Sequence, residues 1–503
     1  MAHVDSAAGA PSGHVVVVGG GITGLSAAHR LLGRGARVTV LEASDRLGGK
    51  LLTGEIAGVQ TDLGAEAMLA RRPEAVDLAR EVGLGAQLRP PATTAAALWT
   101  RGALVPMPKG HVMGVPGDAA ALAGVLSEEG LRRVEQDRTL PRTEVGDDVA
   151  IGAYVAARLG REVVDRLVDP LLGGVYAGDA YQISMRAAVP QLYEVARSHT
   201  SLTAGVRALQ RRAADQPRTG PVFMGVEGGV GRLPLAVADA VRARGGTIVT
   251  GARVTGLHRV GAGPYQTAAP STASAGPTDG APRWRVTVTT GSDGARAHRH
   301  PGGTGPVGSA VDADAVVLAV PAPAAARLLA AESPAAAAEL HSVEYASMAL
   351  VTLAYRRAAV TLPEGSGFLV PPVDGRTIKA ATFSARKWAW VADQDPDLLV
   401  LRTSVGRYGE EHVLERGDAE LTDVARHDLR EATGLTAAPV ASLVTRWHQG
   451  LPQYPVGHQA RVRRIREELG KLPGLAVCGA AYDGVGIPAC IAGAYAAVDR
   501  LTG

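Results

Sequence analysis

Three glycines near the beginning of the chain have the spacing of a nucleotide-binding turn. Gly19, Gly21 and Gly24 form G-x-G-x-x-G directly after the apolar residues 15–18. Gly19 permits a tight turn, Gly21 lets backbone amides approach a pyrophosphate, and Gly24 lets the next helix pack closely on the strand. Glu42 ends a second apolar run, where a carboxylate accepts hydrogen bonds from a ribose 2′-hydroxyl and repels a 2′-phosphate. The sequence therefore predicts a βαβ unit that binds a dinucleotide without that phosphate.

Two further glycine-rich segments narrow the choice of cofactor. Gly48 and Gly49 lie between Arg46 and Lys50, and close backbone approach beside two cations predicts a second phosphate cradle. Residues 474–491 contain an apolar run, a glycine-rich turn and the start of a helix. Both segments resemble those of flavoproteins in the amine oxidase and protoporphyrinogen oxidase superfamily. The resemblance implies FAD as cofactor, with the C-terminal segment closing over the flavin ring.

Composition excludes several other classes of function. The 503 residues carry a formal net charge of +3, which does not favour a nucleic-acid or polybasic membrane surface. The first 13 residues lack the pattern of a secretory signal, and glycines, Asp483 and Pro488 interrupt the apolar stretch 476–498. No cluster of His, Asp or Glu with metal-ligand spacing lies near the two cysteines, Cys478 and Cys490, in the sequence, so we expect no metal site. We expect the two thiols to be reduced and the protein to be cytoplasmic.

The predicted fold class is α/β and α+β, with a discontinuous organisation. A Rossmann-type FAD-binding domain is expected from residues 12–70, 220–335 and 440–503. A sheet-based substrate-binding domain is expected from residues 71–109, 205–219 and 336–439, where strands such as 348–355 and 398–404 alternate. A mainly helical lobe is expected from residues 110–204, with helical spacing at 119–127, 149–159 and 161–168.

Two low-complexity stretches interrupt this organisation. Residues 262–281 and 292–310 are rich in Gly, Ala, Pro, Ser and Thr and flank a short strand at 284–289. They have too little apolar surface to offset the cost of ordering, so we expect disordered loops on a hairpin. His298 and His300 in the second stretch are expected to be solvated rather than metal-bound.

Four longer sequence segments narrow the resemblance to one group within this superfamily. Residues 106–116, 169–179, 367–371 and 446–458 resemble segments of the bacterial HemY-type porphyrinogen oxidases. The resemblance runs from about residue 15 to residue 501, and residues 109–111 and 446–458 are most similar to the Gram-positive coproporphyrinogen III oxidases. It implies oxidation of coproporphyrinogen III in haem biosynthesis by molecular oxygen, and transient contact with a ferrochelatase.

The chemistry implied by this resemblance places few demands on the protein. A hydride leaves a meso carbon of the macrocycle for the flavin, a pyrrole N–H loses a proton, and oxygen reoxidises the flavin with formation of hydrogen peroxide. Positioning and desolvation carry most of the catalysis in such a reaction. No catalytic residue is therefore assigned.

Residue assignments follow from the motifs and from the resemblance. Arg71 and Arg72 are candidate guanidinium partners for substrate propionates. The other substrate-binding candidates line the macrocycle by resemblance, and they are Gly174, Val175, Leu369, Thr382 and Phe383. The cofactor-binding candidates are Gly19, Gly20, Gly21, Ile22, Thr23, Gly24, Glu42, Ala43, Lys50, Gly64, Ala65, Glu66, Ala67, Val254, Trp447, Val485, Gly486 and Ile487.

Three alternatives stay open at this point. Protoporphyrinogen IX is a second possible substrate, and the sequence does not separate it from coproporphyrinogen III. A flavin amine oxidase shares the Glu42 and double-glycine features, but Trp388 and Trp390 do not lie in the C-terminal string where that family carries its aromatic pair. A non-catalytic tetrapyrrole carrier is the third alternative.

Overall fold

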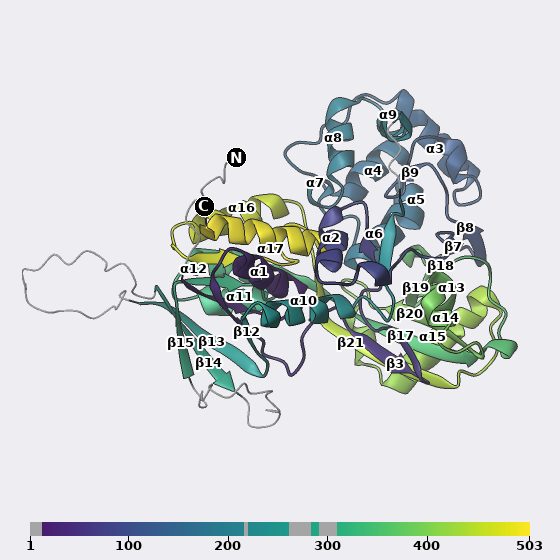
Figure 1. Cartoon of the computed structure of the whole chain (residues 1–503). Coiled ribbons are helices and arrows are strands. Elements are labelled where there is room, and N and C mark those ends of the chain that lie inside the picture. The colour runs from purple at the N-terminus through teal and green to yellow at the C-terminus, as the bar shows by residue number, and fades with distance from the viewer. Residues whose placement is uncertain (1–12, 216–219, 261–282, 291–308, 503) are drawn as a thin grey trace, which may run out of the picture.

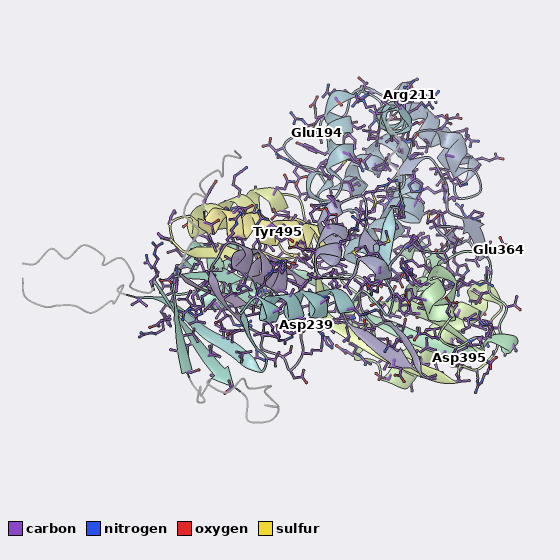
Figure 2. The ribbon with its side chains drawn as sticks, viewed as in Figure 1. Glu194, Arg211, Asp239, Glu364, Asp395 and Tyr495 are labelled. Carbon is purple, nitrogen blue, oxygen red and sulfur yellow. The ribbon has the colours of Figure 1, made fainter. Side chains whose placement is uncertain are left out.

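Three parts make up the chain in the computed structural model, which describes residues 13–215, 220–260, 283–290 and 309–502 (Figure 1). We call them the Rossmann domain, the sheet domain and the helical lobe. The mixed α/β and α+β class predicted from the sequence is confirmed. Figure 2 shows labelled charged side chains at the outside of each part, such as Glu194 on the lobe, Asp239 on the Rossmann domain and Asp395 on the sheet domain.

A five-stranded parallel sheet forms the centre of the Rossmann domain. In spatial order its strands are β12 (Thr247–Val249), β2 (Arg37–Leu41), β1 (His14–Val18), β16 (Ala315–Leu318) and β22 (Leu475–Val477). The side chains of β1 alternate between two cores, because successive residues of a strand point to opposite faces. Val15 and Val17 pack with one layer of helices, and Val16 and Val18 pack with the other layer.

The two layers that cover the parallel sheet are built from different elements. The first contains α1 (Ile22–Gly33), α10 (Arg232–Ala243) and α17 (Ile487–Thr502). The second contains α11 (Ala322–Leu329), α12 (Pro334–His341), α16 (His458–Leu469) and an antiparallel sheet of β13 (Ala252–Arg259), β14 (Trp284–Thr290) and β15 (Ser309–Ala313). Shorter elements beside the first layer are β5 (Met68–Leu69), α2 (Pro73–Glu81), β6 (Leu88–Arg89) and β11 (Phe223–Val226). The hairpin of β3 (Thr53–Ile56) and β4 (Val59–Asp62) packs instead on the core of the sheet domain.

The sheet domain is built on seven strands. In spatial order they are β21 (Ala441–Pro452), β17 (Tyr345–Arg356), β20 (Leu398–Val405), β19 (Ile378–Thr382), β18 (Gly367–Leu369), β7 (Ala97–Thr100) and β8 (Ala103–Pro106). One face packs in a core with α13 (Ser384–Lys387), α14 (Ala389–Ala392) and α15 (Asp418–Thr433). On the other face every second residue of β19 and of the end of β20 is only half-buried. We call this half-buried face the inner face.

The helical lobe has its own hydrophobic core. Its elements are β9 (His111–Val112), β10 (Val115–Pro116), α3 (Glu128–Glu135), α4 (Ile151–Leu159), α5 (Arg161–Val163), a π-helical segment (Val164–Val168), α6 (Asp169–Tyr176), α7 (Met185–Ala188), α8 (Pro190–Ser198) and α9 (Leu202–Asp215). Arg158 and Asp137 form a fully buried ion pair inside it, with Nε donating to a carboxylate oxygen at 2.7 Å. The helix expected over residues 119–127 is shorter than predicted: only Ala119–Leu122 is helical, and it forms a 3-10 turn.

Several predicted domain assignments differ from the observed packing. Residues 73–89, expected in the substrate domain, pack beside α1 and α10, and residues 336–341 end α12 in the Rossmann domain. Residues 53–62, expected in the Rossmann domain, pack on the core of the sheet domain. Residues 205–215, expected in the substrate domain, belong to α9, which packs on the core of the lobe. Residues 441–452, expected in the Rossmann domain, form β21 at the edge of the seven-stranded sheet. Residues 262–281 and 292–308, with His298 and His300, lie outside the described residues, whereas residues 309 and 310 begin β15. Among the described residues no helix has both the length and the apolarity needed to cross a membrane.

Candidate active site

The three glycines of the nucleotide-binding turn have the geometry that their spacing predicts. Gly19 has a φ of +111°, which favours glycine. A methyl group on Gly24 would lie 1.9 Å from the Gly19 carbonyl oxygen, so no larger residue allows this packing of α1. A methyl group on Gly21 would meet only the Gly49 Cα, at 4.0 Å. The surface at Gly21 is therefore open to a ligand.

Anion-binding groups surround that opening. Gly21 precedes α1 without a capping side chain, and the first turn of α1 has no acidic residue, so its N–H groups can face a pyrophosphate. Glu42 is held beside the turn, because its carboxylate accepts from Gly20 N at 2.6 Å and from Ser44 N at 2.8 Å. This placement at the end of β2 suits a group that binds an adenosine ribose.

The double-glycine segment packs directly against this turn. Gly48 N donates to the Gly20 carbonyl oxygen at 2.9 Å, and Gly21 and Gly48 form a parallel bridge. On the other side, Ala252 N donates to the Glu42 carbonyl oxygen at 2.8 Å, which places β13 beside Glu42. Val254 follows on that strand, where it is half-buried.

A turn at residues 62–66 carries the next cofactor candidates, and we call it the flavin turn. A methyl group on Gly64 would lie 2.2 Å from the Lys50 carbonyl oxygen and 3.3 Å from the Trp447 ring. Trp447 Nε1 donates to the Leu63 carbonyl oxygen at 2.9 Å, so Trp447 is fixed against the turn. Burial lowers the pKa of the Lys50 ammonium, as expected for a cation beside a dry site.

Glu66 forms a buried ion-pair cluster with two cations from the sheet domain. Its carboxylate accepts from Lys387 Nζ at 2.5 Å and lies 3.1 Å from an Arg402 Nη atom. Burial alone raises the pKa of Glu66, but the charges of Arg402 and Lys387 outweigh it and hold the pKa at about 2. Arg402 also donates to the carbonyl oxygens of Asp62 and Gly64, at 3.1 and 2.8 Å. The Glu66 side chain therefore anchors the flavin turn to the sheet domain.

Sequence reasoning missed Arg402 and Lys387. One signal was present, because Arg402 interrupts an otherwise apolar strand, and a charge in such a strand indicates a buried partner. Nothing comparable marked Lys387, which ends the short helix α13.

The C-terminal segment completes the arrangement. Ile22 at the start of α1 and Ile487 at the start of α17 belong to the same hydrophobic cluster, so the two helix N-termini converge. Gly484 N donates to the Tyr454 hydroxyl at 2.8 Å, and Val485 packs against the core of the lobe. The remaining cofactor candidates occupy the same region: Thr23 is buried in α1, Ala43 is exposed after β2, Ala65 is exposed in the flavin turn, Ala67 packs on the sheet core and Gly486 is exposed before α17.

Four of the substrate candidates come from facing elements. Leu369 pairs with Ala380, two residues before Thr382, so Leu369 and Thr382 share the inner face of the sheet. A methyl group on Gly174 would lie 3.8 Å from Leu369 Cδ2, which places α6 opposite that face. Val175 on the same helix is 45% exposed.

The assignment of Phe383 to the substrate surface was wrong. Phe383 is 1% exposed and belongs to the core behind the sheet. Its ring packs edge-to-face on Phe368, with 6.1 Å between the ring centroids. Trp388 and Trp390 are also buried in that core, so neither offers an aromatic face to a substrate.

The two candidate propionate partners differ in their surroundings. Arg72 pairs with Glu74, with 2.8 Å between Nη2 and a carboxylate oxygen. Arg71 is exposed, and no carboxylate of the described residues lies within ion-pair distance of it. Both precede α2, which packs against α17.

Comparison with known proteins agrees with these arrangements. The family model described as flavin containing amine oxidoreductase matches residues 22–502. The coproporphyrinogen III oxidase of Mycobacterium tuberculosis (strain ATCC 25618 / H37Rv) is 37% identical over 490 residues, which cover 96% of each chain. The coproporphyrinogen III oxidase of Bacillus subtilis (strain 168) is 31% identical over 503 residues, which cover 97% of this chain and 98% of that protein.

Solved structures show the same fold. A crystal structure from Exiguobacterium sp. 255-15, assigned as a protoporphyrinogen oxidase, has a TM-score of 0.80 and 31% identity, covering 98% of this chain and 99% of that chain. Cyclohexylamine oxidase from Brevibacterium oxydans has a TM-score of 0.64 at 18% identity, covering 98% of this chain and all of that chain, and shows the fold alone. The family resemblance and the FAD cofactor expected from the sequence are confirmed. The chain therefore belongs to the flavin containing amine oxidoreductase family, and within it to the group that includes these coproporphyrinogen III oxidases.

Proposed function

We propose that the chain is an FAD-dependent coproporphyrinogen III oxidase of haem biosynthesis that uses molecular oxygen and produces hydrogen peroxide. The observation that carries this proposal is the connection made by Arg402. It lies on the inner face of the seven-stranded sheet, directly opposite Thr382 in the β19–β20 pair, and it donates to the flavin turn. A macrocycle between the inner face and α6 would therefore lie next to the flavin.

The residues present fit FAD. The open surface at Gly21 and the uncapped N-terminus of α1 would hold the pyrophosphate, and Glu42 would hold the adenosine ribose. Gly64 and Trp447 would contact the flavin ring, and Val485 to Ile487 would close over it. When bound, the flavin supplies the acceptor for hydride from the macrocycle.

The protein's own contribution is binding, orientation and exclusion of water. Gly174 lets α6 approach the inner face closely, because a methyl group at this position would already be in van der Waals contact with Leu369. Arg71 and Arg72 supply guanidinium groups for propionates. No side chain is given a catalytic role, since the proposal requires only that the meso carbon be held next to the flavin.

Partner and location are also proposed. The porphyrin product needs a metal-inserting enzyme as its consumer, so we propose transient contact with a ferrochelatase. A cytoplasmic location is supported by Cys478 and Cys490, which are buried free thiols, as is usual in reducing compartments.

An anaerobic stopped-flow experiment tests the function. Coproporphyrinogen III should bleach the flavin absorbance of the purified yellow protein, and porphyrin fluorescence should appear when oxygen is admitted. Protoporphyrinogen IX, offered in competition, should be consumed more slowly, and a monoamine should leave the flavin oxidised. Bleaching by the monoamine alone would establish an amine oxidase. No bleaching by either porphyrinogen would reject the proposal.

A further inference from the structure

A serine on the inner face of the seven-stranded sheet carries a hydroxyl that the protein does not use. Ser404 lies in β20, two residues after Arg402, and both side chains are half-buried on that face. No group of the described residues forms a hydrogen bond with the Ser404 hydroxyl, and this hydroxyl is not among the unpartnered polar atoms that packing buries. The hydroxyl is therefore open to a molecule on the inner face.

Two neighbouring hydroxyls are closed off, so this openness is not general in the sheet. Thr352 pairs with Arg402 in the register of β17 and β20, and Thr403 lies on the opposite face of β20. Both hydroxyls lack a partner within the part of the chain that the structure describes, and both are buried, in residues that are 0% and 1% exposed. Neither hydroxyl reaches a ligand.

The strand register places Ser404 between the two side chains that hold the flavin turn. The strands β21, β17 and β20 lie side by side (Figure 1). Leu350 of β17 pairs with Ser404 on one side and with Thr445 on the other. Arg402 lies two residues before Ser404, and Trp447 lies two residues after Thr445, on the other side of this row. Since Arg402 and Trp447 both donate to carbonyl oxygens of the flavin turn, the Ser404 hydroxyl lies next to the proposed flavin site.

The residues in the same row as Ser404 are small or apolar. Its partner on β19 is Ala380, which pairs in turn with Leu369 on β18. Ala380 and Leu369 are half-buried, and Leu350 on the other side of Ser404 is 5% exposed. This row offers an apolar surface with one hydroxyl, which suits the uncharged part of a flat ligand.

The cations near this row are already engaged inside the protein. Arg402 donates to the flavin turn. Lys379, which precedes Ala380 on β19, donates from Nζ to the Gly406 carbonyl oxygen at 2.8 Å. A propionate beside Ser404 would therefore have to compete for these cations, whereas an uncharged N–H group needs only the hydroxyl oxygen as acceptor.

We propose that the Ser404 hydroxyl binds a pyrrole N–H of the porphyrinogen and so orients a meso carbon of the macrocycle next to the flavin. The assignment rests on the proposed function. Each pyrrole ring of a porphyrinogen carries an N–H donor, and the serine oxygen accepts from it. Oxidation leaves ring nitrogens without hydrogen, to which the same hydroxyl donates, so one group serves both substrate and product.

Anaerobic stopped-flow measurements on the FAD-loaded protein test the assignment. Ser404→Ala should bind coproporphyrinogen III about three- to tenfold more weakly, as judged from the concentration dependence of flavin bleaching. Protoporphyrinogen IX should lose the same factor, because both macrocycles carry the same pyrrole N–H groups. A loss confined to coproporphyrinogen III would assign the hydroxyl to a propionate and overturn the inference. A changed flavin spectrum of Ser404→Ala without substrate would overturn it too, because the hydroxyl would then contact the flavin.

Two further variants serve as controls. Ser404→Thr keeps a hydroxyl and should restore most of the affinity. Thr403→Val removes a buried, unpartnered hydroxyl from the opposite face and should bind both porphyrinogens like the natural chain. Ser404→Ala should unfold at the same urea concentration as the natural chain, because the lost hydroxyl has no partner among the described residues.

The outcomes separate this assignment from the proposed function. Unchanged binding of both porphyrinogens by Ser404→Ala, in a protein whose natural chain is bleached by them, would overturn the role of Ser404 alone. An equal loss in Thr403→Val would do the same, because it would show a general effect on the sheet. No bleaching of the natural chain by either porphyrinogen would reject the proposed function and, with it, this assignment.

Discussion

The guanidinium of Arg402 donates to the carbonyl oxygen of Gly64 at 2.8 Å, across the boundary between the sheet domain and the flavin turn. The same guanidinium reaches the Asp62 carbonyl oxygen and the Glu66 carboxylate. Because Arg402 extends from the inner face of the sheet, one side chain fixes the spacing between the proposed substrate surface and the flavin turn.

Arg402→Lys should impair turnover more than it impairs FAD binding. Lysine keeps the charge beside Glu66 but loses the planar fork that reaches two carbonyl oxygens. We expect kcat to fall roughly ten- to hundredfold, as for a misplacement of about 1 Å, with normal FAD content and a shifted flavin absorption spectrum. Arg327→Lys, at an exposed position on α11, is the matched control. An unaltered spectrum and kcat would show that Arg402 does not position the flavin turn.

Glu66→Gln should produce a pH-dependent loss of stability. The pKa of Glu66 is lowered from 4.5 to about 2, so its carboxylate stabilises the fold above pH 4.5 and loses this effect as the pH falls towards 2. The shift corresponds to about 3 kcal/mol. Urea unfolding at pH 7 should therefore give the variant a free energy of unfolding that is lower than that of the natural chain by about that amount. This difference should narrow below pH 4.5; a difference that stays constant down to pH 3 would contradict the ion-pair cluster.

Gly21→Val should abolish FAD binding without unfolding the protein. The new side chain would project into open space, where it blocks the approach of a pyrophosphate to the backbone. The variant should purify colourless, with a far-UV spectrum like that of the natural chain. Gly33→Val, at the exposed C-terminal end of α1, should stay yellow and release FAD rather than FMN on denaturation. A yellow Gly21→Val protein would place the cofactor elsewhere.

Alanine at Arg71 or Arg72 should weaken coproporphyrinogen III binding by about 1.5–3 kcal/mol at the position that holds a propionate. The loss should appear as a raised KM with little change in kcat, because a clamp holds ground and transition states alike. Protoporphyrinogen IX lacks two of these propionates and should suffer less. Arg80→Ala, at an exposed position on α2, is the control. No loss from either single variant or from the double variant would remove the pair from the site.

Gly174→Leu should raise KM for the porphyrinogen strongly and leave FAD content normal, since the β-carbon alone would contact Leu369 and the rest of the side chain would cover the proposed substrate surface. Gly173→Leu is the matched control, because its side chain points about 100° away around the same helix. Steady-state kinetics with both variants check this. Equal losses in the two variants would indicate general damage to α6 instead of a blocked substrate surface.

Local patterns predicted much of the cofactor region and less of the substrate region. The roles of Gly19 and Gly24 follow from spacing alone, because a turn and a helix contact between near neighbours depend on local backbone geometry. The Lys387–Glu66 pair joins residues 321 positions apart, and no sequence spacing encodes such a contact. Phe383 was misassigned for a simpler reason: a shift of one residue from Thr382 changes the face of the sheet.

The strand order of the Rossmann domain has a consequence for how the protein is made. β1 pairs with β16, whose partner on the other side is β22 near the end of the chain. On a ribosome the first strand must therefore wait until more than 400 further residues have been synthesised before its sheet is complete. Contacts of such high sequence separation form slowly and leave apolar edges exposed meanwhile. The proposed FAD site includes the N-termini of both the first and the last helix. FAD bound there would stabilise the completed sheet, so we expect the refolding yield to rise when FAD is present.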